Sequence, residues 1–265
     1  MIKFFRQIRQ SMINQNRTKK YLLYAIGEII LVVIGILIAL QINNWNENRK
    51  ARAIEINYLK NIKNDLNQEV LNNKHFEDFR FSKVKAASYL LNTKEPQSIE
   101  DAKAYVDNYE TVFRWNTFVP NNNTFKELLS SGKLSLITND SIKNQLLELD
   151  KFYADISINE DHMRREFQDY LYDIQIYNTS GLDFFDNADP NYGAPKRLSL
   201  SDIPDSRYQK IIEDSQWLFN DQTFGNGLKL AILNNGLIAK THKDLDEDFK
   251  ALISLIEEEI LIDKY

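Results

Sequence analysis

The most pronounced pattern along the chain is an uninterrupted apolar run near its start. Residues 21–42 read YLLYAIGEIILVVIGILIALQI, in which Glu28 is the one charged residue and Gln41 a further polar one. As an α-helix the run would be about 33 Å long, which exceeds the roughly 30 Å hydrocarbon core of a bilayer. The pattern predicts a transmembrane helix over residues 21–43.

Aromatic residues mark both ends of this predicted helix. Tyr21 and Tyr24 stand at one end and Trp45 at the other, where amphipathic rings favour the membrane interface. A cleaved signal peptide is the alternative, because a basic region precedes the apolar one. Its leader would be unusually long, and residues 39–41 (ALQ) make a poor cleavage site. The sequence therefore favours an uncleaved anchor.

Beyond residue 43 the apolar positions follow helical spacing. A stripe of residues recurs every four positions: Ile54, Tyr58, Ile62, Leu66 and Val70, with Leu59 and Asn73 beside them. This spacing predicts that the first helix continues as an amphipathic helix until Glu95-Pro96. Proline then ends the helix, because it lacks the N–H and restricts the residue before it.

Capping residues and further apolar stripes predict the later elements. One helix is predicted at 99–113, with Ser98 as its N-cap, and a short one follows, with Thr124 as its N-cap, Glu127 at the capping-box position and Gly132 at its C-terminal end. Two longer helices are predicted, one from Asp140 or Ser141 to Ile174 and one from 223 to 261. Residues 134–137 read as a short strand or a packed connector. Residues 178–206, with three Pro and two Gly, read as an irregular loop.

Four long helices with apolar stripes predict an antiparallel bundle. The predicted fold class is therefore all-α, with one N-terminal transmembrane helix that continues into an extracytoplasmic antiparallel helical bundle over residues 44–265.

Composition narrows the possible functions. The 265 residues include no Cys, 8 Gly and 5 Pro, which excludes a disulfide scaffold and a thiolate site and argues against a sandwich of many short strands. With 33 Lys and Arg against 38 Asp and Glu, the net charge is -5. The part after the apolar run is acidic, so we expect no nucleic-acid partner.

The distribution of cations predicts the orientation. Six cations and no acid precede the apolar run, whereas Arg49, Lys50 and Arg52 after it are partly offset by Glu47. The positive-inside rule then places the N-terminus in the cytoplasm and the C-terminal domain in a periplasmic or other extracytoplasmic space, with the anchor in the inner membrane. Residues 1–20 form a basic cytoplasmic tail. It reads either as an amphipathic helix on anionic lipid or as a topology signal without fixed structure.

Small residues form a stripe within the predicted transmembrane helix. Gly27, Leu31, Gly35 and Ala39 recur every four residues, and small residues at such spacing let a second helix approach closely. Glu28 lies beside the stripe, and a carboxylate within a membrane suggests a partner. In the alternative interpretation it reaches the headgroups or is protonated. We interpret these five residues as a helix–helix interface.

No sequence motif indicates catalysis. The three His residues lie in polar helical stretches, outside metalloprotease and di-iron patterns, and neither a nucleotide-binding loop nor a nucleophile elbow is present. Residues 160–166, EDHMRRE, are typical of a solvated helix face. Phe113, Trp115, Phe118 and Phe125 read either as core or as a partner surface. We predict no metal, no cofactor and no enzymatic activity.

The anchor also carries a resemblance to a known family. The stretch FFRQIRQ…KYLLYAIGEIILVVIGILIALQINNWNENRK, roughly residues 3–50, resembles a family of bacterial single-pass membrane proteins known as a domain of unknown function. A looser similarity is present in TFKELLSSGKLSLITNDSIKNQL at 124–146. The resemblance implies an integral membrane protein and no established activity.

Two functions fit these observations. The first is an accessory protein whose transmembrane helix and bundle bind a protein partner or a second copy of the chain. The second is a ligand-sensing bundle, which would need a separate signalling partner because its cytoplasmic tail is too short for an output domain.

Overall fold

The computed structural model describes residues 18–179, 185–186 and 196–262. Its elements, in chain order, are the helices α2 (Thr18–Asn92), α3 (Ile99–Phe113), α4 (Asn123–Ser130), the 3-10 turn η1 (Leu134–Leu136), α5 (Asp140–Phe167), the π-helix η2 (Gln168–Tyr172), α6 (Asp173–Asn178), the strands β1 (Phe185–Asp186) and β2 (Lys196–Arg197), and the helices α7 (Asp205–Asn220) and α8 (Gln222–Ile262). The predicted all-α fold with a long apolar N-terminal helix is confirmed. Most of the predicted basic tail lies outside the described residues.

The chain divides into two compact units, Met1–Tyr58 and Leu59–Tyr265. In the first unit the structure describes one element, the N-terminal part of α2. Every other helix belongs to the second unit, which is the helical bundle.

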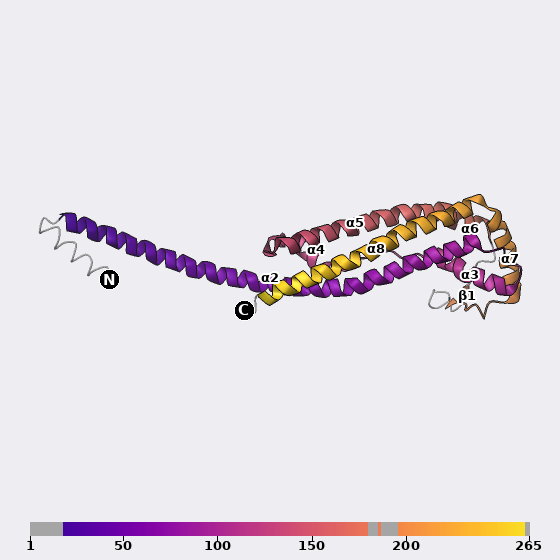
Figure 1. The fold of residues 1–265 in the computed structure, drawn as a ribbon, viewed down its shortest axis with the longest axis horizontal. Helices are drawn as coiled ribbons and strands as arrows, with labels where there is room; N and C mark the ends of the chain where they lie inside the picture. Colours follow the sequence, from indigo (N-terminus) through magenta and orange to yellow (C-terminus); the bar gives the residue numbers. More distant parts are fainter. Residues whose placement is uncertain (1–17, 180–184, 187–195, 263–265) are drawn as a thin grey trace. The chain divides into compact units, whose positions relative to one another are not determined.

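Side-chain contacts give the directions of the long helices in the bundle. Lys63 lies 3.3 Å from Glu257, whereas Asn73 further along α2 donates to the carbonyl of His242 at 2.6 Å. Residue numbers rise on α2 as they fall on α8, so these helices are antiparallel. Helices α5 and α8 lie side by side (Figure 1) and are also antiparallel. Consequently α2 and α5 run in the same direction.

The chain returns between these two parallel helices through α3, an irregular segment and α4. Residues 114–122, called the return segment below, run back along α2: Lys83 donates to the carbonyl of Arg114, and Asn72 donates to that of Val119 at 3.0 Å. Together with α3 and α4, this segment completes one leg of an up-down-up-down bundle.

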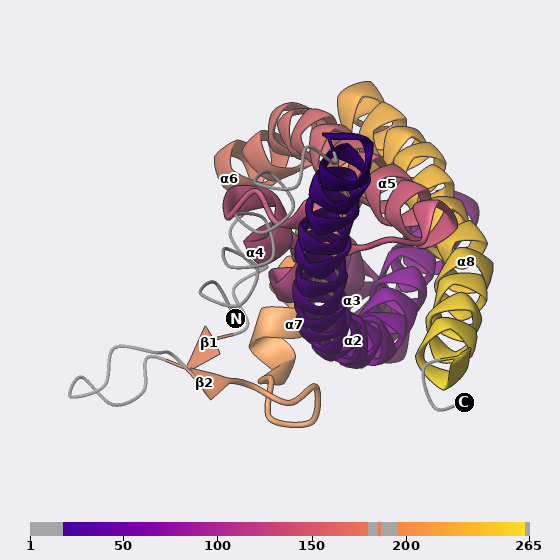
Figure 2. The ribbon, with the colours of Figure 1, turned by 90° about the vertical axis from the view of Figure 1, so that its left-hand side faces the viewer.

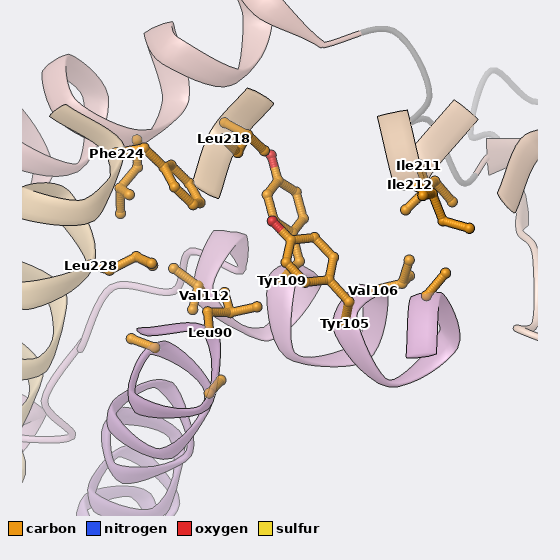
Figure 3. Packing of buried hydrophobic residues seen from close by; sticks show 14 of the residues in the cluster. Leu90, Tyr105, Val106, Tyr109, Val112, Ile211, Ile212, Leu218, Phe224 and Leu228 are labelled. Carbon is orange, nitrogen blue, oxygen red and sulfur yellow. The ribbon is translucent and has the colours of Figure 1, made fainter. Parts of the chain in front are cut away.

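Buried apolar side chains of α2, α3, α7 and α8 form a core at one end of the bundle (Figure 3). Tyr105 and Tyr109 of α3 stack with their ring centroids 5.9 Å apart, and Leu218 of α7 and Phe224 of α8 lie close to them. Helix α7 was not predicted, because residues 207–222 were assigned to no element. It covers this end of the bundle.

Several predicted helix ends are confirmed, and one is wrong. Ser98 caps α3 by accepting a bond from Asp101 N at 3.2 Å, and Gly132, with φ 67°, follows α4. Thr124 does not cap α4, which begins one residue earlier. Its N–H donates instead to the carboxylate of Asp65 on α2 at 2.9 Å.

The remaining connections include a 3-10 turn and a pair of short strands. Residues 134–136 form a 3-10 turn rather than a strand, and the predicted helix up to Ile174 contains the π-helix η2. Within the predicted loop 178–206, β1 and β2 pair in antiparallel fashion, and β2 leads towards α7 (Figure 2).

Gly227 allows α8 to pack closely on η2. A Cβ at this position would lie 2.7 Å from the carbonyl oxygen of Tyr170 and 2.8 Å from a methyl carbon of Leu171. We therefore expect Gly227→Ala to lower the free energy of unfolding by about 1–3 kcal/mol, because backbone has to move. The measurement is chemical denaturation of the full-length chain in detergent.

Gly225→Ala is the matched control for this experiment. A Cβ there meets nothing within 4 Å, so the change should raise the free energy of unfolding by about 0.5–1 kcal/mol through helix propensity alone. Equal effects of the two substitutions would contradict the close packing of Gly227.

Candidate functional site

The N-terminal part of α2 is long and apolar enough to cross a membrane. None of its most apolar stretch is buried within the chain. A helix that keeps its whole circumference apolar and uncovered requires a lipid or protein environment. This helix is therefore a candidate membrane anchor.

The predicted interface residues lie in open surroundings on this helix. A Cβ at Gly27 or Gly35 would meet nothing within 4 Å, and the side chain of Leu31 is 71% exposed. Ala39 is exposed and Glu28 is half-buried. Their spacing on one helix places the small residues Gly27, Gly35 and Ala39 along one strip, in which Leu31 is the bulky member. Their role as an interface stays a prediction.

Two of the three predicted aromatic anchors have described side chains. Tyr24 and Trp45 are exposed, and the guanidinium of Arg49 lies 5.3 Å from the centroid of the Trp45 ring. An indole ring and a cation placed together suit the boundary between hydrocarbon and headgroups. Tyr21 lies in α2, but its side chain is outside the described part.

The buried face of α2 within the bundle follows a seven-residue pattern. Alternating steps of three and four residues connect positions that are each at most 5% exposed: Leu59, Ile62, Leu66, Glu69, Asn73, Phe76, Arg80, Lys83, Ala87 and Leu90. The four-residue stripe inferred from the sequence was partly wrong, because Ile54 is 49% exposed and Val70 is half-buried. Polar residues occupy four of these core positions.

These polar residues belong to a buried group that we call the polar core. It comprises Glu69, Asn73, Arg80 and Lys83 of α2, Glu160 of α5, and Asn235 and His242 of α8. This group was not predicted from the sequence.

The centre of the polar core is an ion pair between Arg80 and Glu160, both almost fully buried. Arg80 also donates to the carbonyl of Asn116 at 2.9 Å, and Glu160 accepts from the N–H of Phe118 at 3.0 Å. The pair thus holds the return segment between α2 and α5. Burial lowers the pKa of Arg80, while Glu160 opposes that shift.

Lys83 lies one turn from Arg80 and is 2% exposed. Its ammonium donates to the carbonyl of Arg114 and lies 5.3–5.6 Å from the ring centroids of Phe167, Trp115 and Phe79. Burial, with a smaller effect of the nearby Arg80 charge, lowers the pKa of Lys83 to about 7. The cavity beside it has a volume of about 20 Å³, which is room for one water molecule and not for a substrate.

His242 and Asn73 form a second buried pair. His242 Nδ1 lies 2.7 Å from the Asn73 side-chain oxygen, and the ring contacts Phe118 edge-on with the centroids 4.9 Å apart. Burial, followed by the charge of Arg80, lowers the pKa of His242 to about 4, so the ring is neutral at pH 7. The Nδ1–H therefore donates to Asn73.

The polar core corrects two interpretations of the sequence. Glu160 was assigned to a solvated face, yet it is 2% exposed, whereas Asp161 and His162 beside it are exposed as expected. His242 was placed in a polar stretch, yet it is fully buried. The seven-residue spacing on α2 could have indicated both, because it places polar residues of α2 in the core. Buried polar residues need polar partners from other helices, and Glu160 and His242 are such partners.

The aromatic cluster belongs mostly to the core. Phe118 and Phe125 are buried, and Phe118 packs edge-on against Phe76 with the centroids 5.2 Å apart. Phe113 and Trp115 are half-buried beside Phe167. Within the part of the chain that the structure describes, no three acidic or His side chains are grouped closely enough to hold a metal ion.

Comparison with known proteins gives one match. The sequence model of a family of unknown function (DUF6090) matches residues 28–185, more than half of the chain. The matched range begins within the apolar part of α2 and includes α3, α4 and α5. No curated protein and no solved structure matches.

Proposed function

Because the chain belongs to this family of unknown function, its role has to be inferred from its own residues, and we propose that it is a membrane-anchored, non-enzymatic interaction protein. Its α2 helix would cross the inner membrane once, with the N-terminus in the cytoplasm, and associate with a second membrane helix. The bundle would be extracytoplasmic and take part in binding the partner protein or second copy. The lipid bilayer is a further proposed partner, and we propose no nucleic-acid partner.

The open strip at Gly27, Gly35 and Ala39 is the observation that carries this proposal. Hydrocarbon tails are as apolar as leucine, so membrane helices associate by close packing rather than by the hydrophobic effect. Small residues make this packing possible because they allow the two backbones to approach. Glu28 beside the strip would add a polar contact to the partner helix.

The buried polar core supports a binding role rather than a catalytic one. Polar residues at core positions of packed helices favour one register, because any other register leaves them without partners. Here the partners are the ion pair of Arg80 with Glu160 and the hydrogen bonds of Asn73 with His242. A bundle fixed in this way presents a constant surface to a partner.

Gly35→Ile tests the proposed association. The isoleucine side chain would hold the second backbone away, so we expect most of the signal in a membrane two-hybrid assay to be lost. Val33→Ile, which enlarges a residue on the opposite side of the helix, should leave the signal unchanged. A signal that survives Gly35→Ile would count against the strip as the interface.

A ligand-sensing bundle is the second candidate function. It is favoured by a small apolar pocket at the α7-covered end of the bundle. Coupling to a response would require a separate signalling partner.

A further inference from the structure

A small pocket lies between α2, α3, α7 and α8, at the end of the bundle shown in Figure 3. It has a volume of about 90 Å³, and its walls are mainly apolar: Leu90, Leu91, Leu218, Phe219, Phe224 and Leu228 line it, together with Tyr105 and the bare backbone of Gly225. A dry engineered cavity of about 150 Å³ binds benzene. The pocket is therefore large enough for a few heavy atoms.

Two buried tyrosine hydroxyls of α3, one of them in the pocket wall, have no hydrogen-bond partner among the described residues. Tyr105, which lines the pocket, is 2% exposed, and Tyr109, stacked on it, is 1% exposed. In Figure 3 both hydroxyls point towards the space between Leu218 and Phe224. An unpaired buried hydroxyl destabilises the folded chain, so a ligand that bonds with it would recover this loss.

The charge state of the tyrosines limits the chemistry of the ligand. Burial raises the pKa of both Tyr105 and Tyr109 above the ordinary value, and the negative charge of Asp214 raises it further. The hydroxyls are thus neutral donors at physiological pH. The same negative potential disfavours an anion.

We propose that this pocket binds a small uncharged organic molecule, with an apolar body and an oxygen that accepts a hydrogen bond from Tyr105. Ketones and esters have this chemistry. The apolar body would replace the contacts that an empty pocket lacks, and the oxygen would accept the hydrogen bond of the Tyr105 hydroxyl. The site does not depend on the proposed association through α2.

2-Butanone is a suitable probe because its five heavy atoms fit the pocket. We expect saturable chemical-shift changes of the Leu218 and Leu228 methyl groups in the full-length, methyl-labelled chain in detergent. Tyr105→Phe should weaken binding about tenfold through the lost hydrogen bond. Gly225→Leu should abolish it, because a Cβ at Gly225 meets open space and the side chain can fill the pocket.

The stability of the ligand-free variants provides an independent test. Tyr105→Phe should leave the melting temperature unchanged or raise it, because it removes an unpaired hydroxyl. Tyr208→Phe is the matched control: its hydroxyl donates to the carbonyl of Leu200 at 2.6 Å, so this change should lower the melting temperature. Shifts that do not saturate, equal affinity of Tyr105→Phe and wild type, or a loss of stability equal to that of Tyr208→Phe would each overturn the proposal.

Discussion

Replacing Arg80 with Met should lower the free energy of unfolding by about 3–5 kcal/mol. The loss arises because the Glu160 carboxylate would stay buried without its counter-charge, which costs more than the ion pair itself contributes. The carbonyl of Asn116 would lose a donor as well. Chemical denaturation of the full-length chain, followed by tryptophan fluorescence, measures this change, since Trp115 lies 5.8 Å from the Arg80 guanidinium.

Two further variants separate the buried charge from general disruption. The double variant Arg80→Met with Glu160→Met should be more stable than Arg80→Met alone, because no uncompensated charge is left in the core. Arg164→Met removes an exposed pair with Asp161, joined at 2.6 Å, and should cost less than about 1 kcal/mol. Additive losses would contradict the buried ion pair: the free energy of unfolding of the double variant would then be lower than that of Arg80→Met by the whole effect of Glu160→Met alone.

Lys83 should make the bundle more stable as the pH rises from 7 towards 10. In the unfolded chain this lysine keeps its proton up to about pH 10.5, whereas in the folded chain its pKa is about 7. Between these values the unfolded state binds one more proton, so raising the pH favours folding by about 1.4 kcal/mol per pH unit. Below pH 7 both states are protonated, and the full penalty for burying the charge applies.

The measurement is the difference between the wild type and Lys83→Met, by denaturation at several pH values from 7 to 9.5. Other groups titrate equally in both chains, so the difference isolates Lys83. The rise should be absent from Lys83→Met. If the free energy of unfolding changed with pH equally in the wild type and in Lys83→Met, the lowered pKa of Lys83 would be contradicted.

Much of the fold could be predicted from the sequence because local signals were strong. The apolar run and the cap at Ser98 each depend on residues close together in the chain, as does the left-handed turn at Gly132. Helix α8, at Gln222–Ile262, matches the predicted 223–261 closely, because its apolar residues follow helical spacing throughout.

The polar core and the return segment could not be predicted in this way. Arg80, Lys83 and Glu160 are of residue types that are rarely buried, and their burial depends on partners from other elements. Thr124 has the sequence pattern of an N-cap, in which the Glu127 side chain would accept the Thr124 N–H. In the structure the carboxylate of Asp65, distant in sequence, accepts this N–H. Helix α7 follows directly on an irregular loop and has no side-chain N-cap, so no strong local signal marks its start.

The most direct test of the proposed interaction role is the native mass of the full-length chain, extracted in mild detergent from membranes. We expect an assembly of fixed stoichiometry, containing either a second copy of the chain or one partner protein, and we expect Gly35→Ile to dissociate it. A single chain without a partner, for wild type and Gly35→Ile alike, would contradict the proposal that α2 associates with another membrane helix.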